Sequence, residues 1–258
     1  MEAAIALQPE RMALLLLFAS LRTGAALMLL PALGGQLIPL RVRIGLSGCV
    51  GWLVMTTNSG VLPPDDLLSL AGLAAIGGEL LIGAVAALAL HAAFAVAMVA
   101  GEWLAQTMGL GFATMVSPGS APAPVLSGLF ALLMWALFLT SGGHLILLRL
   151  IYESYQAMPV AGPLFEPDRL AAIIEWGSFA LATGVIAALP LGAAMLLVNL
   201  ALAVAARSAP QLNLFSIGFP LMLLAGLVGL PLALPGMAES LSGALISMQE
   251  RAAEVLLG

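Results

Sequence analysis

Residues 67–100 read LLSLAGLAAIGGELLIGAVAALALHAAFAVAMVA, an apolar run in which Glu79 is the only charged residue. At a rise of about 1.5 Å per residue, a helix over this run is longer than the ~30 Å hydrocarbon core of a bilayer. We therefore expect it to tilt, to project beyond the bilayer, or to break near Gly77 and Gly78. So long a segment with a single charged residue is not expected in a soluble domain.

The composition of the whole chain agrees with this interpretation. Its 258 residues are 62% hydrophobic and 8% charged, with no lysine, and the mean hydropathy is +1.13. Soluble domains are ~45–50% apolar and ~25% charged, so the composition predicts an all-α integral membrane protein. A single cysteine, Cys49, excludes an internal disulfide and a cysteine-based metal site, and a net charge of −5 argues against nucleic acid as a partner.

Helices are predicted where charge is scarce and end where proline, glycine and acidic residues cluster. We expect a single domain over residues 1–258 with about six long hydrophobic helices, some kinked or hairpin-like, and a C-terminal amphipathic helix. No signal peptide is expected, because residues 1–10 hold no basic residue. The predicted hydrophobic helices cover 12–33, 44–57, 67 to beyond 100, 125–150, 173–205 and 214–234.

The amphipathic helix is expected after Pro235 and Gly236, over residues 237–257. Helical periodicity places its apolar residues on one face and its acidic residues elsewhere, which predicts a helix for a partner or an interface. The apolar face consists of Met237, Leu241, Ala244, Leu245, Met248, Ala252, Val255 and Leu256.

An irregular segment without charge lies between two predicted helices. Residues 109–124 hold three prolines and three glycines, so they cannot form a regular helix for long. Hydrocarbon would penalise the unpaired backbone groups of such a segment by several kcal/mol each. We therefore expect it to lie inside protein or along an aqueous path.

Ionisable residues within the apolar segments are candidates for function, because charge is costly in a membrane. The four such residues that we expect to be buried are Arg22, Glu79, Glu102 and His144. Arg22 faces a pore or partner, or pairs with an acid such as Glu79. Glu79 and Glu102 are proton or cation sites, or are hydrogen-bonded inside protein or at helix ends. His144 is expected to be structural, because the chain has only one other histidine and no metal-binding pattern surrounds it. We predict no metal, no cofactor and no catalysis, since the usual catalytic motifs are absent.

Small residues recur at helical spacing, as at Gly45, Gly48 and Gly51, Gly78 and Gly83, and Gly226 and Gly229. Such residues let helix backbones approach closely in a membrane. Either these residues allow helices of this chain to pack against one another, or they allow the chain to pack against other subunits of an assembly.

Two blocks resemble the FliR/SctT family of type III export gate subunits. One is GEWLAQTMGLGFATMVSP at residues 101–118, and the other is RSAPQLNLFSIGFP at residues 207–220, preceded by NLAL at 199–202. Gly143 and His144 recur in the family too, and the resemblance covers essentially the whole chain. Its second block is closer to the flagellar branch, and the signature residues are Asn199, Arg207, Pro210, Gln211, Asn213, Phe215, Gly218 and Pro220.

This resemblance implies a subunit of the flagellar export gate in the basal body at the bacterial inner membrane. It implies FliP-like and FliQ-like chains as partners in a pore for unfolded flagellar proteins, with a FlhB-like protein at the cytoplasmic entrance. It also implies that the irregular segment contributes to a plug. The plug residues expected here are Met108, Gly109, Gly111, Phe112, Met115, Val116, Ser117 and Pro118.

One position departs from the family, which commonly has an acid where this chain has Ser117. A plug mechanism that uses a carboxylate at this position is therefore not expected, and we expect bulky apolar side chains such as Phe112 and Met115 to form a steric seal.

Two alternatives are open for Arg207. It bonds carbonyl groups at a helix end or an acid of a neighbouring subunit, or the turn that it begins makes no contact with another subunit. The main alternative function is a stand-alone secondary transporter for a small solute, with Arg22, Glu79 and Glu102 as coupling residues; an intramembrane enzyme comes third.

Overall fold

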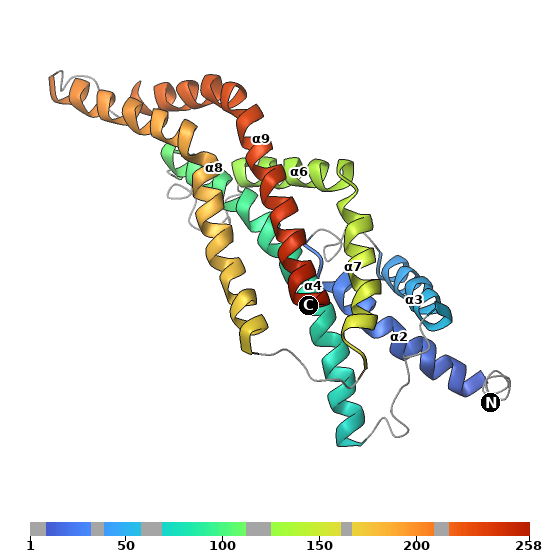
Figure 1. The fold of residues 1–258 in the computed structure, drawn as a ribbon. Helices are drawn as coiled ribbons and strands as arrows, with labels where there is room; N and C mark the ends of the chain where they lie inside the picture. Colours follow the sequence, from blue (N-terminus) through green and yellow to red (C-terminus); the bar gives the residue numbers. More distant parts are fainter. Residues whose placement is uncertain (1–8, 32–38, 58–68, 112–124, 161–166, 209–216) are drawn as a thin grey trace. The chain divides into compact units, whose positions relative to one another are not determined.

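The computed structural model describes residues 9–31, 39–57, 69–111, 125–160, 167–208 and 217–258. These residues form α-helices and no strand, which confirms the predicted all-α class (Figure 1). Within them, four helices are long and apolar enough to cross a membrane, or up to five if the broken pair α6 and α7 is one span. The helices are α2 (Pro9–Leu29), α3 (Leu40–Thr57), α4 (Leu70–Thr107), α6 (Val125–Thr140), α7 (Gly143–Ala157), α8 (Pro167–Ser208) and α9 (Phe219–Leu257).

The long apolar run that opens the sequence forms one unbroken helix, α4, which passes through Gly77 and Gly78. Its 38 residues correspond to about 57 Å at the usual helical rise. The predicted helix over 125–150 is instead two helices, because Gly142 takes a left-handed conformation (φ +71°) between α6 and α7. A residue without a Cβ adopts that conformation without strain, so the chain turns there.

The predicted boundary at Pro235 is wrong. Helix α9 continues through both Pro231 and Pro235, so the sixth hydrophobic helix and the C-terminal amphipathic helix are one element of 39 residues. A proline removes one backbone hydrogen bond and bends a helix, but neighbouring groups can satisfy the freed carbonyl and let the helix continue.

The chain divides into two compact units, which are described separately. Unit 1 comprises residues 1–92, 142–176 and 247–258, and unit 2 comprises residues 93–141 and 177–246. Helices α4, α8 and α9 therefore each contribute residues to both units.

In unit 1, small residues bring α2 close to both α3 and α4. Helices α2 and α3 lie side by side (Figure 1), and a Cβ added to Gly51 would lie 3.0 Å from Ser20. A Cβ on Gly83 of α4 would overlap the carbonyl oxygen of Arg22 in α2. By contrast, a Cβ added to Gly45 or Gly48 would have no neighbour within 4 Å among the residues that the structure describes.

In unit 2, the C-terminal third of α4 packs against glycines of α8 and α9. Trp103 lies against Gly192 of α8, and Met108 against Gly226 of α9. Near Gly101, a Cβ would lie 2.6 Å from the backbone nitrogen of Ser127 in α6. Phe94, Trp135 and Phe138 form an aromatic cluster with centroid distances of 5.0–6.3 Å.

The predicted apolar face of the C-terminal segment is confirmed, since all eight of its residues are at least 97% buried. Its assignment to a partner is wrong, because the chain itself covers this face. Periodicity identifies an apolar face but carries no information on which surface covers it.

The contact at Gly83 leads to a first prediction. Gly83→Ala places a methyl group where the backbone of α2 lies, so α2 must shift, and overpacking of this kind costs ~1–3 kcal/mol. We expect the midpoint of thermal unfolding of the purified chain in detergent to fall by several degrees. Gly77→Ala is the matched control in the same helix, because a Cβ there meets nothing within 4 Å. Equal midpoints for the two variants would contradict this packing.

Candidate functional site

Arg22 and Glu79 form a bidentate ion pair inside unit 1. The Arg22 Nε donates to Glu79 Oε2 at 2.9 Å, and Nη2 donates to Oε1 at 2.8 Å. The exposed fractions of the two side chains are 0% and 2%. Of the two alternatives that the sequence left open for Arg22, the structure therefore shows the pairing with Glu79. A buried charge needs this kind of partner, because its desolvation costs several kcal/mol.

The same guanidinium group also holds the C-terminal end of α7. Its Nη1 donates to Ser154 Oγ and its Nη2 to the carbonyl oxygen of Met158, both at 2.9 Å. It lies 4.0 Å from the ring centroid of Tyr155, a cation–π distance, and the Tyr155 hydroxyl donates to the carbonyl oxygen of Ala19 in α2. One arginine thus connects α2, α4 and α7.

In this arrangement the carboxylate of Glu79 is already occupied by Arg22. Both of its carboxylate oxygens accept hydrogen bonds from one cation, and the pair is neutral as a unit. A proton or cation bound at Glu79 would have to displace Arg22 inside a buried site. In this structure Arg22 and Glu79 therefore form the structural ion pair that the sequence analysis set beside a coupling role.

The structure corrects the interpretation of Glu102 and His144 as enclosed polar residues, since both side chains are exposed in this chain. Glu102 accepts a hydrogen bond from Gln106 Nε2 at 2.8 Å, one turn along α4. Each was assigned to a span from local hydropathy, which does not show which side of a helix faces outward. Among the described residues, no group of three or more His, Cys, Asp or Glu could hold a metal ion.

In unit 2, α4 ends in a Schellman motif directly before the irregular segment. Gly109 has φ +78°. Its N–H donates to the carbonyl oxygen of Gln106 at 3.1 Å, and the N–H of Leu110 donates to that of Ala105 at 2.9 Å. These are the two bonds that define the motif. The carbonyl oxygen of Thr107 is left for a partner from elsewhere.

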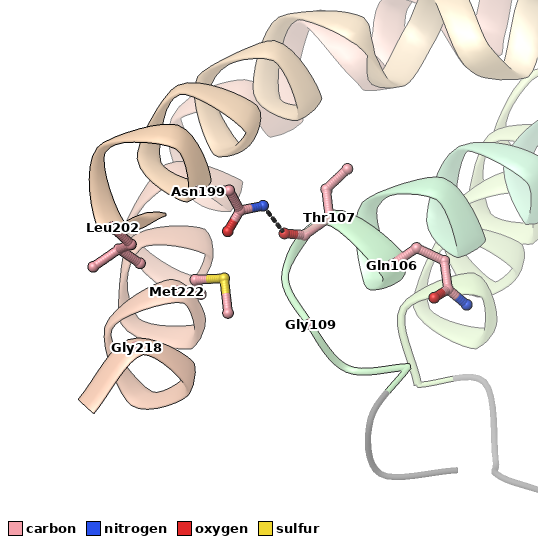
Figure 2. Close-up of a pocket in the computed structure, with 7 residues that line it drawn as sticks. All are labelled: Gln106, Thr107, Gly109, Asn199, Leu202, Gly218 and Met222. Carbon is pink, nitrogen blue, oxygen red and sulfur yellow. Dashed lines mark hydrogen bonds between the residues drawn. The ribbon is translucent and has the colours of Figure 1, made fainter. Parts of the chain in front are cut away.

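Asn199 of α8 supplies that partner. Its Nδ2 donates to the carbonyl oxygen of Thr107 at 3.0 Å, as Figure 2 shows. Its Oδ1 is buried and has no hydrogen-bond partner among the residues that the structure describes. A pocket of about 280 Å³ lies beside the amide, lined by Gln106, Thr107, Gly109, Asn199, Leu202, Gly218 and Met222.

The remaining signature residues fall partly within the described ranges. Arg207 lies exposed in the last turn of α8, where a cation suits the negative end of a helix. Gly218 lines the pocket, and Pro220 lies in the first turn of α9. Outside the described residues lie Pro210, Gln211, Asn213 and Phe215 of the signature, and Phe112, Met115, Val116, Ser117 and Pro118 of the expected plug.

Sequence reasoning missed a feature that these contacts share with two others. Side chains from distant parts of the chain also donate to carbonyl oxygens at the ends of α2 and α9: His91 of α4 bonds that of Leu29, and Arg169 of α8 bonds that of Val255. His91 and Arg169 carried no motif. For His91, its place as a polar residue in an apolar run was the only available signal.

A family model and several known relatives of this chain all point to the same family of bacterial export proteins. The family model described as "Bacterial export proteins, family 1" matches residues 13–248. Flagellar biosynthetic protein FliR of Escherichia coli K12 is 35% identical over 80% of this chain and 79% of its own. FliR of Aquifex aeolicus is 32% identical over 88% and 87%, and FliR of Bacillus subtilis is 31% identical over 81% of each.

The buried ion pair leads to a second prediction. Arg22→Met leaves the Glu79 carboxylate buried without a counter-charge, which costs ~3–5 kcal/mol, so the unfolding midpoint of the purified chain in detergent should fall steeply. The double variant Arg22→Met/Glu79→Met should recover part of that loss, because it removes both charges. The exposed pair Arg149 and Glu153 provides the control, and Arg149→Met should leave the midpoint unchanged. A double variant less stable than either single variant would argue against the pairing.

Proposed function

The chain belongs to the bacterial export proteins of family 1 and is a membrane component of the flagellar export apparatus, and we propose that it forms a pore with FliP-like and FliQ-like chains. Unfolded flagellar proteins pass through this pore. The complex lies in the inner membrane, in the flagellar basal body, with a FlhB-like protein at its cytoplasmic entrance. The chain itself has no catalytic role.

One observation supports an assembly most strongly: the most apolar parts of α8 and α9 are mostly not buried within this chain. The most apolar windows of α8 and α9 are only 28% and 11% buried. Exposed large apolar patches typify surfaces that meet another protein or lipid. On α8 and α9 the exposed side chains include Leu181, Ile186, Leu189, Leu196, Leu197, Leu200, Val204, Leu221, Leu224, Leu227, Val228 and Leu232.

We further propose that residues 109–124 seal this pore. The support is that the segment has no charge, that its backbone cannot lie in lipid, and that α4 is firmly positioned where it begins. Bulky apolar side chains exclude water and small ions yet can move for a polypeptide. Such a seal needs no carboxylate at Ser117.

The assembly can be tested by co-expression. We expect affinity purification of this chain to recover FliP-like and FliQ-like chains in a stable complex that native electrophoresis resolves. Arg207→Ala should weaken that complex, because the exposed guanidinium is proposed to bond a neighbouring subunit, while Arg149→Met should not. A monomer or homodimer that transports a small solute in liposomes would refute the proposal.

The seal can be tested separately. Deletion of residues 112–117 should raise the small-ion conductance of the purified complex in planar bilayers, because the apolar side chains that exclude water are removed. Recovery of partner chains must match that of the intact complex, so that a change in conductance reflects the pore and not its assembly. An unchanged conductance would remove this role from the segment.

A further inference from the structure

Helix α3 combines cations with an exposed apolar surface. Arg41 and Arg43 lie in its first turn, where Arg41 is exposed and Arg43 is half-buried. The buried residues of α3 are Ser47, Gly51 and Val54, of which the first two lie against α2. At about 100° per residue, the exposed positions extend over more than half of the helix circumference. The large apolar side chains among them are Leu40, Val42, Ile44, Leu46, Trp52 and Leu53.

The two arginines give α3 a positive charge in a chain that is negative as a whole. The net charge of the chain is −5, yet residues 12–64 contain three arginines and no acidic residue. Of these three, Arg22 is neutralised by Glu79. Cations in the first turn of a helix are unfavourable, because they lie at the positive end of the helix dipole. The stability of α3 therefore does not account for Arg41 and Arg43, whereas a negatively charged partner does.

The apolar part of α3 has about the length of one leaflet of a bilayer. Residues 44–55 carry no charge and extend for about 18 Å at the usual helical rise, against ~15 Å for half of the hydrocarbon core. Helix α3 is not among the helices that are long and apolar enough to cross a membrane. At its far end, the hydroxyl groups of Thr56 and Thr57 donate to the carbonyl oxygen of Leu53, so they need no water. With its arginines at the bilayer surface, α3 ends near the bilayer centre.

We propose that the exposed surface of α3 binds phospholipids with an anionic headgroup. Arg41 and Arg43 hold the headgroup, because guanidinium groups form charge-assisted hydrogen bonds with phosphate oxygens, and the apolar side chains deeper in the leaflet contact the acyl chains. A zwitterionic headgroup carries its own cation, so the two arginines favour a headgroup with net negative charge. A single neighbouring helix covers one side of α3, whereas lipid surrounds all of its exposed sides.

The test identifies the lipid around α3 with Trp52 as the reporter. Trp52 lies about 17 Å from Arg41 along the helix, at the depth of the acyl chains, and brominated acyl chains quench tryptophan fluorescence on contact. The full chain is reconstituted in phosphatidylcholine vesicles with equal small fractions of brominated phosphatidylglycerol or brominated phosphatidylcholine. We expect stronger quenching by the brominated phosphatidylglycerol. Trp52→Phe should remove the difference, because the other tryptophans lie in other helices.

Substitution of the arginines tests the selection of the headgroup. Arg41→Gln should lower the preference for phosphatidylglycerol about fivefold, the ratio that ~1 kcal/mol per arginine near an anionic surface produces. Arg41→Lys should retain most of the preference, because it keeps the charge. Arg149→Gln is the matched control, since Arg149 is an exposed arginine of α7 that pairs with Glu153. All three variants should unfold at the midpoint of the unmodified chain in neutral detergent, because both arginines are exposed.

Three results would overturn the inference. Equal quenching of the unmodified chain by the two brominated lipids would show that α3 selects no headgroup. An equal fall for both lipids in Arg41→Gln would show that the substitution moves α3 and does not change lipid selection. Quenching of the chain alone that is lost in the complex with its partner chains would show that a neighbouring subunit covers α3.

This inference requires a membrane protein but not the proposed pore. If the FliP-like and FliQ-like chains are not recovered with this chain, the proposed assembly fails. Lipid selection by α3 is then still decided by the quenching of the chain alone.

Discussion

Where water is excluded, a carbonyl oxygen at the end of a helix needs a hydrogen-bond donor from elsewhere in the protein. Helices α2, α4, α7 and α9 meet this requirement with side chains that lie far away in the sequence, namely His91, Asn199, Arg22 and Arg169. Each bond joins a helix end to another helix and so also fixes the arrangement of helices within its unit. A few polar residues thereby organise a chain whose other contacts are mostly apolar and weakly directional.

Arg22 combines two requirements in one side chain. Its charge is balanced by Glu79, and its remaining hydrogen bonds reach Ser154 and the end of α7. Because the Arg22–Glu79 pair has no net charge, it has little electrostatic effect on groups far from it. What remains is a junction of three helices that apolar packing could not specify as well, since apolar contacts tolerate sliding.

Composition and periodicity predicted the all-α membrane class and the apolar face of residues 237–256, and the pairing of Arg22 with Glu79 was one of two alternatives that the sequence left open. These succeeded because they depend on local pattern or on the high cost of burying a charge alone. The continuity of α9 through Pro235 and the division of residues 125–150 at Gly142 were missed, because the surroundings decide whether such a residue bends or ends a helix. The exposure of Glu102 and His144 was missed because hydropathy does not orient a helix. The hydrogen bond from Asn199 to the Thr107 carbonyl could not be predicted from the sequence, because every residue has a backbone carbonyl and none is marked as an acceptor.

The two residues of the buried ion pair are synthesised at different times, because they are 57 residues apart and the ribosome makes Arg22 first. Ser154 and Met158 follow 132 and 136 residues after Arg22. Until α4 emerges from the ribosome, α2 is an apolar helix with an unpaired cation at its middle, which disfavours insertion by ~2.5–3.5 kcal/mol. The burial of Arg22 is therefore balanced only once the chain that holds Glu79 has been made. The pairing that stabilises the finished protein thus makes the burial of the first helix depend on a helix synthesised after it.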